Sequence, residues 1–218
     1  MRWRMLMMAW CLGLAAGRAA EAWTSLFDGK SAGGWAASGF EAGGAVKMEP
    51  KFRGGSGALV IEAGLTLSGV TWQRGSELPR SNYEVEVEAM KLEGDDFFCG
   101  LTFPVGRAAA TFVVGGWGGT VVGISSLDRI DAAENETSRT REFAPNRWYR
   151  IRVRVTEAHI EAWIDGELFV DVALKDRMVS LRPGEIQRSL PLGIATYMTR
   201  AAVRGMRIRR LSSAAANP

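Results

Sequence analysis

The stretch RWYRIRVRVTEAHIEAWIDGELFVDV, residues 147–172, decides the fold. Over 149–155 apolar residues alternate with arginines, which is the two-residue period of a strand with one buried face and one wet face. The alternation returns at 160–164 and again at 168–172, and Asp165-Gly166 between them suits a tight hairpin turn with left-handed backbone. The stretch therefore predicts three consecutive antiparallel strands.

Short apolar stretches bounded by glycine, proline or polar residues continue on both sides of this centre. No stretch has the 3.6-residue period of a convincing amphipathic helix. We expect an all-β fold, a two-sheet antiparallel β-sandwich. Polar loops are expected over 126–146 and 175–188. The further strands are expected over 23–29, 36–40, 45–49, 58–62, 65–73, 83–92, 97–103, 111–114, 120–125, 190–198 and 203–211.

Rows of opposite charge predict how some strands pair. Glu84, Glu86 and Glu88 lie on one face of the strand expected at 83–92 and would repel one another without cations at the same spacing. Arginines at 150–154 and at 207 and 209 have that spacing. We predict that the acidic strand lies beside at least one of these rows, on a solvent-facing side. Exposed pairs contribute only about 0.2 to 1 kcal/mol each, so they would set register more than stability.

The first residues have the pattern of an export signal. Two arginines precede an apolar run over 5–16, and an A-x-A cleavage pattern follows at 20–22. We expect a signal peptide over 1–22, a single domain over 23–211 and a disordered tail over 212–218. The protein would be secreted or periplasmic, and no later apolar stretch is long enough to span a membrane.

The charge balance gives no reason to expect a nucleic-acid partner. The chain of 218 residues has a formal net charge of +3, and without residues 1–22 it keeps 24 basic and 23 acidic side chains. Binding to nucleic acid or to an anionic membrane needs clustered positive charge that is not offset. Cys99 is the only cysteine outside the predicted signal, so we expect no internal disulfide.

Three segments resemble the secreted 3-keto-disaccharide hydrolase family over residues 23–211. They are SLFDGKSAGGW at 25–35, the central stretch at 147–172, and PLGIATY with VRGMRIRRL at 191–211. The resemblance implies a concanavalin-like jelly roll that acts on sugars oxidised at carbon 3. Such a ketone acidifies the C2 hydrogen, so a base can remove that proton and the glycosidic oxygen can leave. Family members usually carry acidic and histidine residues where this chain has 112–117 and 196–199, and those residues are not matched here.

Candidates for the chemistry therefore come from the residues themselves. Asp95, Asp96, Glu134 and Glu136 are the candidate catalytic bases, and Arg107 or Arg200 would hold the keto sugar. A hairpin turn is the alternative for Asp95 and Asp96. A calcium ion is the divalent metal that we expect if the polar loop wraps one, with Asp128 and Asp131 as ligands, while the alternative is a solvated loop. His159 is the only histidine, which argues against a multi-histidine metal site and a serine-histidine-aspartate triad.

Carbohydrate is the partner expected from the aromatic residues. Trp117, fenced by glycines, is the first candidate for stacking on a sugar ring, and Trp72 and Tyr197 are further candidates. The alternative for Trp117 is that its ring is buried and fills a gap in the core at a β-bulge. The leading hypothesis is an exported hydrolase of 3-keto-glycosides. The alternatives are a glycan-binding module without catalysis and a laminin-G-like adhesion or scaffold domain of the envelope.

Overall fold

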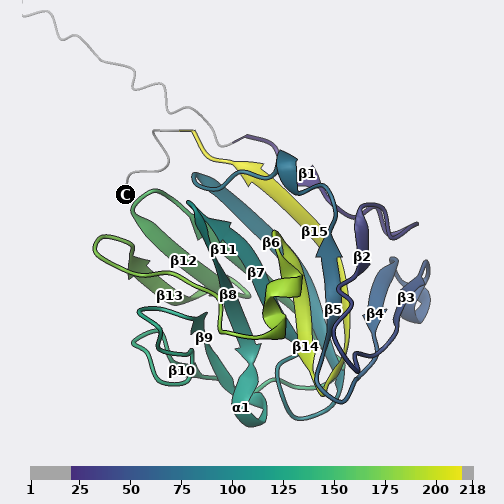
Figure 1. Ribbon diagram of the computed structural model, residues 1–218. Coiled ribbons are helices and arrows are strands. Elements are labelled where there is room, and N and C mark those ends of the chain that lie inside the picture. Colours follow the sequence, from purple (N-terminus) through teal and green to yellow (C-terminus); the bar gives the residue numbers. More distant parts are fainter. Residues whose placement is uncertain (1–20, 213–218) are drawn as a thin grey trace, which may run out of the picture.

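The computed structural model describes residues 21–212 and shows two antiparallel sheets packed face to face (Figure 1). The predicted all-β sandwich is confirmed. The first sheet has the order β13-β12-β11-β6-β15-β4-β3, with β1 paired to β15. Its strands are β1 (Thr24–Ser25), β3 (Val46–Glu49), β4 (Ala58–Ile61), β6 (Tyr83–Glu93), β11 (Trp148–Val155), β12 (His159–Ile164), β13 (Glu167–Ala173) and β15 (Arg200–Arg210).

The second sheet has the order β10-β9-β8-β7-β14-β5-β2. Four short helical turns complete the described part of the chain, and no helix there is long and apolar enough to cross a membrane. Most of the predicted signal peptide and tail lie outside the described residues. The strands are β2 (Trp35–Ala37), β5 (Leu67–Trp72), β7 (Cys99–Val105), β8 (Ala108–Gly115), β9 (Val121–Ser125), β10 (Arg139–Thr140) and β14 (Gly193–Tyr197); the turns are η1 (Phe52–Gly54), η2 (Gly75–Glu77), α1 (Gly116–Gly119) and η3 (Glu185–Ser189).

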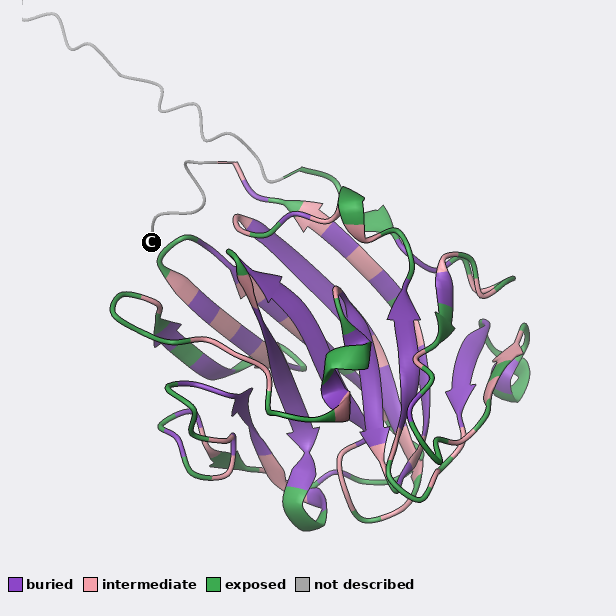
Figure 2. Ribbon diagram, in the orientation of Figure 1, coloured by how far each residue is buried: buried purple, intermediate pink, exposed green. Residues whose placement is uncertain are grey.

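The core lies between the sheets and follows the predicted alternation (Figure 2). On β11 the residues Tyr149, Ile151, Val153 and Val155 are at most 1% exposed, while the arginines between them reach the other face. The connection between the strands expected at 97–103 and 111–114 is shorter than those bounds imply, because Pro104 belongs to β7. β14 pairs with β7 only at residues 100–102, so Pro104 lies where that side of β7 has no strand partner and its missing N–H costs little.

The predicted contact between the acidic strand and a row of arginines is confirmed, and both arginine rows make it. In the strand register Glu84, Glu86 and Glu88 lie between three arginines of β11 and three of β15. The exposure differs from our expectation, because the side chains of Glu84 and Glu86 are only 0% and 9% exposed. The physical reason is that long arginine side chains, and the indoles of Trp23, Trp148 and Trp163 that they contact, cover the carboxylates.

Candidate functional site

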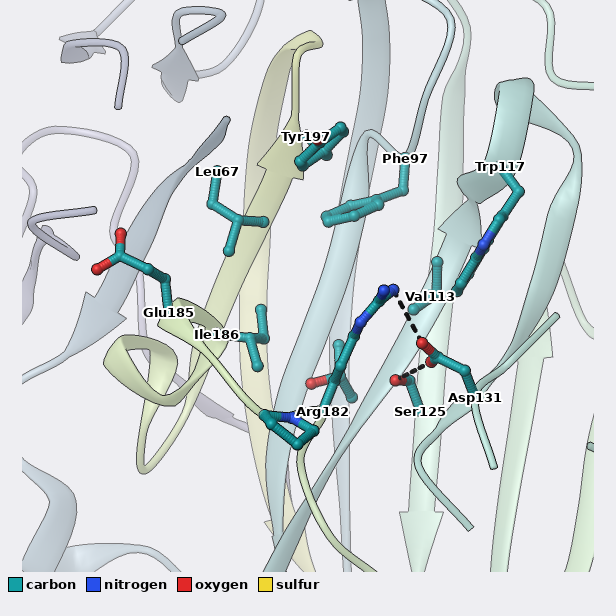
Figure 3. Close-up of a pocket in the computed structure, with 12 residues that line it drawn as sticks. Leu67, Phe97, Val113, Trp117, Ser125, Asp131, Arg182, Glu185, Ile186 and Tyr197 are labelled. Carbon is teal, nitrogen blue, oxygen red and sulfur yellow. Dashed lines mark hydrogen bonds and ion pairs between the residues drawn. The ribbon is translucent and has the colours of Figure 1, made fainter. Parts of the chain in front are cut away.

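A pocket of about 250 Å³ lies on the face of the second sheet that points away from the core (Figure 3). Strands β5, β8, β9 and β14 contribute residues to its floor, and the loop that leads into η3 forms one wall. A largely apolar lining with a few convergent polar groups is typical of a small-molecule site. The lining residues are Leu67, Phe97, Thr111, Val113, Trp117, Ser125, Asp131, Arg182, Pro183, Glu185, Ile186 and Tyr197.

One wall of the pocket is aromatic. The rings of Phe97 and Tyr197 are stacked, with centroids 6.0 Å apart and an interplanar angle of 29°. Phe97 can lie over the floor because Gly100 has no side chain, and a Cβ there would lie only 3.1 Å from the Phe97 ring. The glycine therefore makes the space that the ring occupies, and the pair leaves an apolar surface facing the pocket.

Trp117 belongs to α1, the turn that joins β8 to β9, and its indole forms another side of the pocket (Figure 3). Its backbone has φ 47°, a left-handed conformation that costs a non-glycine residue about 1 to 2 kcal/mol. Gly115, Gly118 and Gly119 also have positive φ, which explains why glycines stand at these positions beside Trp117 in the sequence. The side chain is 41% exposed. The turn thus places the indole at the pocket, and the indole is not buried in the core.

Asp131 brings the polar groups of the pocket together. Its Oδ1 accepts hydrogen bonds from the Ser125 hydroxyl and from the Ala132 N–H, the latter at 2.9 Å. Its Oδ2 lies 2.8 Å from Nη1 of Arg182, whose side chain is 62% exposed and reaches into the pocket. A carboxylate and a guanidinium therefore meet beside Trp117. Three donors point at the carboxylate, and since its two oxygens have about four lone-pair sites, it can still accept a hydrogen bond from a ligand.

The four candidate bases do not line this pocket. Asp96 lies in the β6–β7 connection, where its Oδ1 accepts the Phe97 N–H at 2.7 Å, and Asp95 beside it is exposed. This connection crosses from the first sheet to the second, so it is a turn but not the hairpin that we expected as the alternative. Glu134 is exposed on the loop after β9, and Glu136 is ion-paired with Arg177. The carboxylate that converges with Trp117 in the pocket is Asp131, which the sequence analysis considered only as a metal ligand.

Of the five candidate binding residues, Trp117 and Tyr197 line the pocket and three do not. Trp72 is 6% exposed and packs in the core with its ring centroid 5.5 Å from that of Trp35. Arg107 lines a separate hollow at the β7–β8 hairpin. Arg200 donates to Glu62 at 2.7 Å, and this hydrogen bond is the main cause of the lowered pKa of that carboxyl.

The two candidate calcium ligands have other partners. Asp128 accepts the Met178 N–H at 2.8 Å and pairs with Arg177 at 2.5 Å, and these contacts lower the pKa of the Asp128 carboxyl. Asp131 pairs with Arg182 as described. Within residues 21–212 no three acidic, histidine or cysteine side chains converge. One carboxylate that already holds a guanidinium does not fit the donor set of a divalent metal.

The sequence analysis missed Arg182, Phe97 and the role of Asp131 in the pocket. Asp131 and Arg182 lie on different loops and meet only through the fold, so no local spacing connects them. Asn135-Glu136-Thr137 has the pattern of a glycosylation sequon, and the structure shows what its asparagine does. Asn135 is 6% exposed, and its amide nitrogen donates to the carbonyls of Ile124 and Ile130 at 2.8 and 3.1 Å, so the side chain serves the loop fold.

Comparison with known families decides the classification. A family model described as the 3-keto-alpha-glucoside-1,2-lyase-like domain matches residues 22–209. The chain belongs to this family. The resemblance in the sequence is thereby confirmed, and the family supports a carbohydrate-active domain. A comparison with curated proteins gives no match.

Solved structures share the fold at low sequence identity. The carbohydrate binding module CBM66 from Bacillus subtilis aligns with a TM-score of 0.53 and 12% identity, covering 81% of this chain and 95% of its own. Domain 4 of the arabinanase AbnA from Geobacillus stearothermophilus, in complex with arabinotriose, gives 0.51 and 14%, covering 81% and 82%. The Crh5 transglycosylase in complex with NAG gives 0.56 and 10%, covering 90% and 87%. These similarities concern the fold alone.

Proposed function

We propose that the protein is a saccharide-binding domain and that one sugar ring occupies the pocket beside Trp117. The observation that supports this proposal is the convergence of an exposed indole, the Phe97–Tyr197 wall and the polar Asp131–Arg182 pair in one hollow. A pyranose has apolar C–H faces and a polar rim of hydroxyls. The indole can meet an apolar face, and the ion pair offers both acceptors and donors to the rim.

The size of the pocket supports a single ring. Its volume of about 250 Å³ is small for a ligand site, since such sites commonly measure roughly 300 to 1,000 Å³. The loop at 182–186 closes one side. We therefore expect recognition of a terminal sugar or a short saccharide, with the remaining units outside the pocket. The family and the folds of the carbohydrate-binding neighbours agree with this class of ligand.

Cleavage of 3-keto-glycosides is a second candidate function, favoured by the carboxylate and guanidinium that meet 2.8 Å apart in the pocket. Asp131 would take the C2 proton, and the C2–H electrons would form an enolate whose charge lies on the C3 oxygen, to which Arg182 would donate. The enolate would return to the C3 ketone and form the C1–C2 double bond as the C1–O bond breaks, and the leaving oxygen would take a proton from water. This reaction requires a ketone in the substrate and a proton transfer to Asp131. Binding requires neither, so binding is the first proposal.

A glycan array identifies the mono- and disaccharides that bind, and calorimetric titration with those saccharides then measures the affinity and tests the binding proposal. We expect Trp117→Ala to weaken affinity about tenfold, because an aromatic face contributes roughly 0.5 to 1.5 kcal/mol beyond its area. Leu168→Ala is the control, since Leu168 is 50% exposed and does not line the pocket. Unchanged affinity in Trp117→Ala, or no saccharide bound by the native protein, would overturn the proposal.

Incubation with 3-keto-glycosides separates the two functions. Release of the aglycone by the native protein, lost in Asp131→Asn and reduced in Arg182→Gln, would establish cleavage. Binding without release would leave the protein a binding domain. Glu134→Gln serves as the matched control, because Glu134 is an exposed carboxylate on the same loop as Asp131 that lies outside the pocket.

A further inference from the structure

The outer face of the first sheet carries a groove that the proposed function does not use. Two adjoining hollows of about 430 and 390 Å³ lie there, and both are lined by Glu86, Glu88 and Arg150. Trp148 and Trp163 line the first hollow, and Trp23 lines the second. We call these two hollows together the outer groove. Arg150 lies where they meet.

The carboxylates of the outer groove already have strong partners. Glu86 lies 2.6 Å from Arg207 Nη2, and Glu88 lies 2.7 Å from Arg204 Nε. Arg150 lies 3.8 Å from both glutamates, beyond hydrogen-bond distance. Among the described side chains none accepts a hydrogen bond from its guanidinium, which is also 60% exposed. Arg150 therefore keeps planar donors available to a ligand.

The balance of charge on this face favours an anion. Six arginines from β11 and β15 face four glutamates, which are Glu84, Glu86, Glu88 and Glu161, and Asp171 lies opposite Glu161 on β13, so the patch has an excess of one positive charge. Asp165 at the edge of the groove does not change this balance, because Arg141 and Arg147 hold it at 3.3 and 2.9 Å. An anionic group that approaches from solvent meets Arg150 first, since the other five guanidiniums are less exposed.

We propose that the outer groove is a second saccharide site, specific for saccharides that carry carboxylate or sulfate groups. Arg150 would bind the anionic group through two parallel hydrogen bonds. The indoles of Trp148 and Trp163 would form the walls against which the sugar rings lie. Arg204 contacts Trp148 at 4.1 Å and Arg152 contacts Trp163 at 4.2 Å, and these contacts fix the two indoles in place. The site is independent of the pocket, which lies on the other sheet.

Titration with defined polyanions tests this site. The probes are polygalacturonate for the carboxylate, dextran sulfate for the sulfate and unmodified dextran as the neutral chain. We expect binding of at least one anionic polysaccharide, no binding of dextran at the groove, and weaker binding as salt is added. Arg150→Gln should weaken the anionic affinity about tenfold or more, because a hydrogen bond to a charged group contributes roughly 1.5 to 3 kcal/mol.

Two control variants test whether the effect of Arg150→Gln is specific to the outer groove. Arg129→Gln removes the same charge from an exposed loop outside both sites and should leave the affinity unchanged. Trp117→Ala should also leave it unchanged, which separates this site from the pocket. The proposal is overturned if no anionic polysaccharide binds at low salt or if Arg150→Gln binds as well as the native protein. It is equally overturned if duplex DNA binds as tightly as both polysaccharides, since the face would then lack selectivity for sugars.

Discussion

Glu84 offers the sharpest test of how the first sheet is held together. Its carboxylate is completely buried and lies 2.5 Å from Arg209, 2.9 Å from Arg154 and 3.6 Å from Arg152. The change Glu84→Gln keeps the shape of the side chain and removes its charge. Three guanidiniums, with side chains 23% to 29% exposed, would then lose a shared anion.

The magnitude follows from burial. Breaking a buried ion pair by removing one partner costs about 3 to 5 kcal/mol, because the other charge stays desolvated. The three arginines keep some contact with water, and Arg154 keeps Glu161 at 3.2 Å, so the lower part of that range applies and we expect a loss of about 3 kcal/mol. For a domain of this size that loss corresponds to a fall in Tm of about 6 to 12 °C.

Urea unfolding of Glu84→Gln and Glu161→Gln measures the difference. Glu161 is 23% exposed and pairs with Arg154 alone, so its change should cost less than about 1 kcal/mol. A double-mutant cycle with Arg209→Gln isolates the shortest contact, and we expect a coupling energy above about 1 kcal/mol. Equal losses in Glu84→Gln and Glu161→Gln, with unchanged m-values, would show that the buried carboxylate behaves as a surface one and would refute this reasoning.

Two further predictions concern titratable groups. Burial raises the pKa of the Cys99 thiol to about 12, so in the folded protein at pH 8 a thiol reagent should react with it only after urea unfolds the chain. Hydrogen bonds from the Glu41 N–H and then from Arg188 lower the pKa of Glu185 below its ordinary value of 4.5. The stabilisation that these two contacts give the pocket wall is therefore complete above pH 4.5 and is lost as the pH falls through the lowered pKa. Saccharide affinity measured against pH should fall in that acid range, and Glu185→Gln should show no such step.

The strands and the charge rows could be predicted because both depend on local alternation. Once hydrophobic residues choose the inner face, the charged residues between them must share the outer face, and opposite rows on neighbouring strands attract. The burial of Glu84 was not predictable in this way. It requires side chains from β11, β6 and β15 to lean over one another, which is a property of three strands together.

The pocket depended on contacts that the sequence does not connect. Asp131 was assigned to a metal and Arg182 was overlooked, because a polar loop gives no period from which to infer direction. Of the four carboxylates that were chosen as bases, Asp95 and Asp96 lie in the connection between the two sheets, and Glu134 and Glu136 lie in the polar loop after β9 and are exposed. Convergence of polar groups from separate loops is therefore what the structure adds to the sequence.

The tryptophans show which aromatic residues a sequence can assign to ligands. Trp23, Trp148 and Trp163 lie on arginine-rich strands or beside them, and each has a guanidinium over its ring at 4.1 to 4.6 Å. Within the described part of the chain no ring or guanidinium of this kind contacts Trp117, and its neighbours in sequence are glycines. An indole beside alternating arginines is held in place by guanidiniums, whereas an indole isolated by glycines has no such partner and keeps exposed surface for a ligand. That difference can be recognised in the sequence before the structure is known, and it is why Trp117 lines the pocket while the other three flank a charged groove.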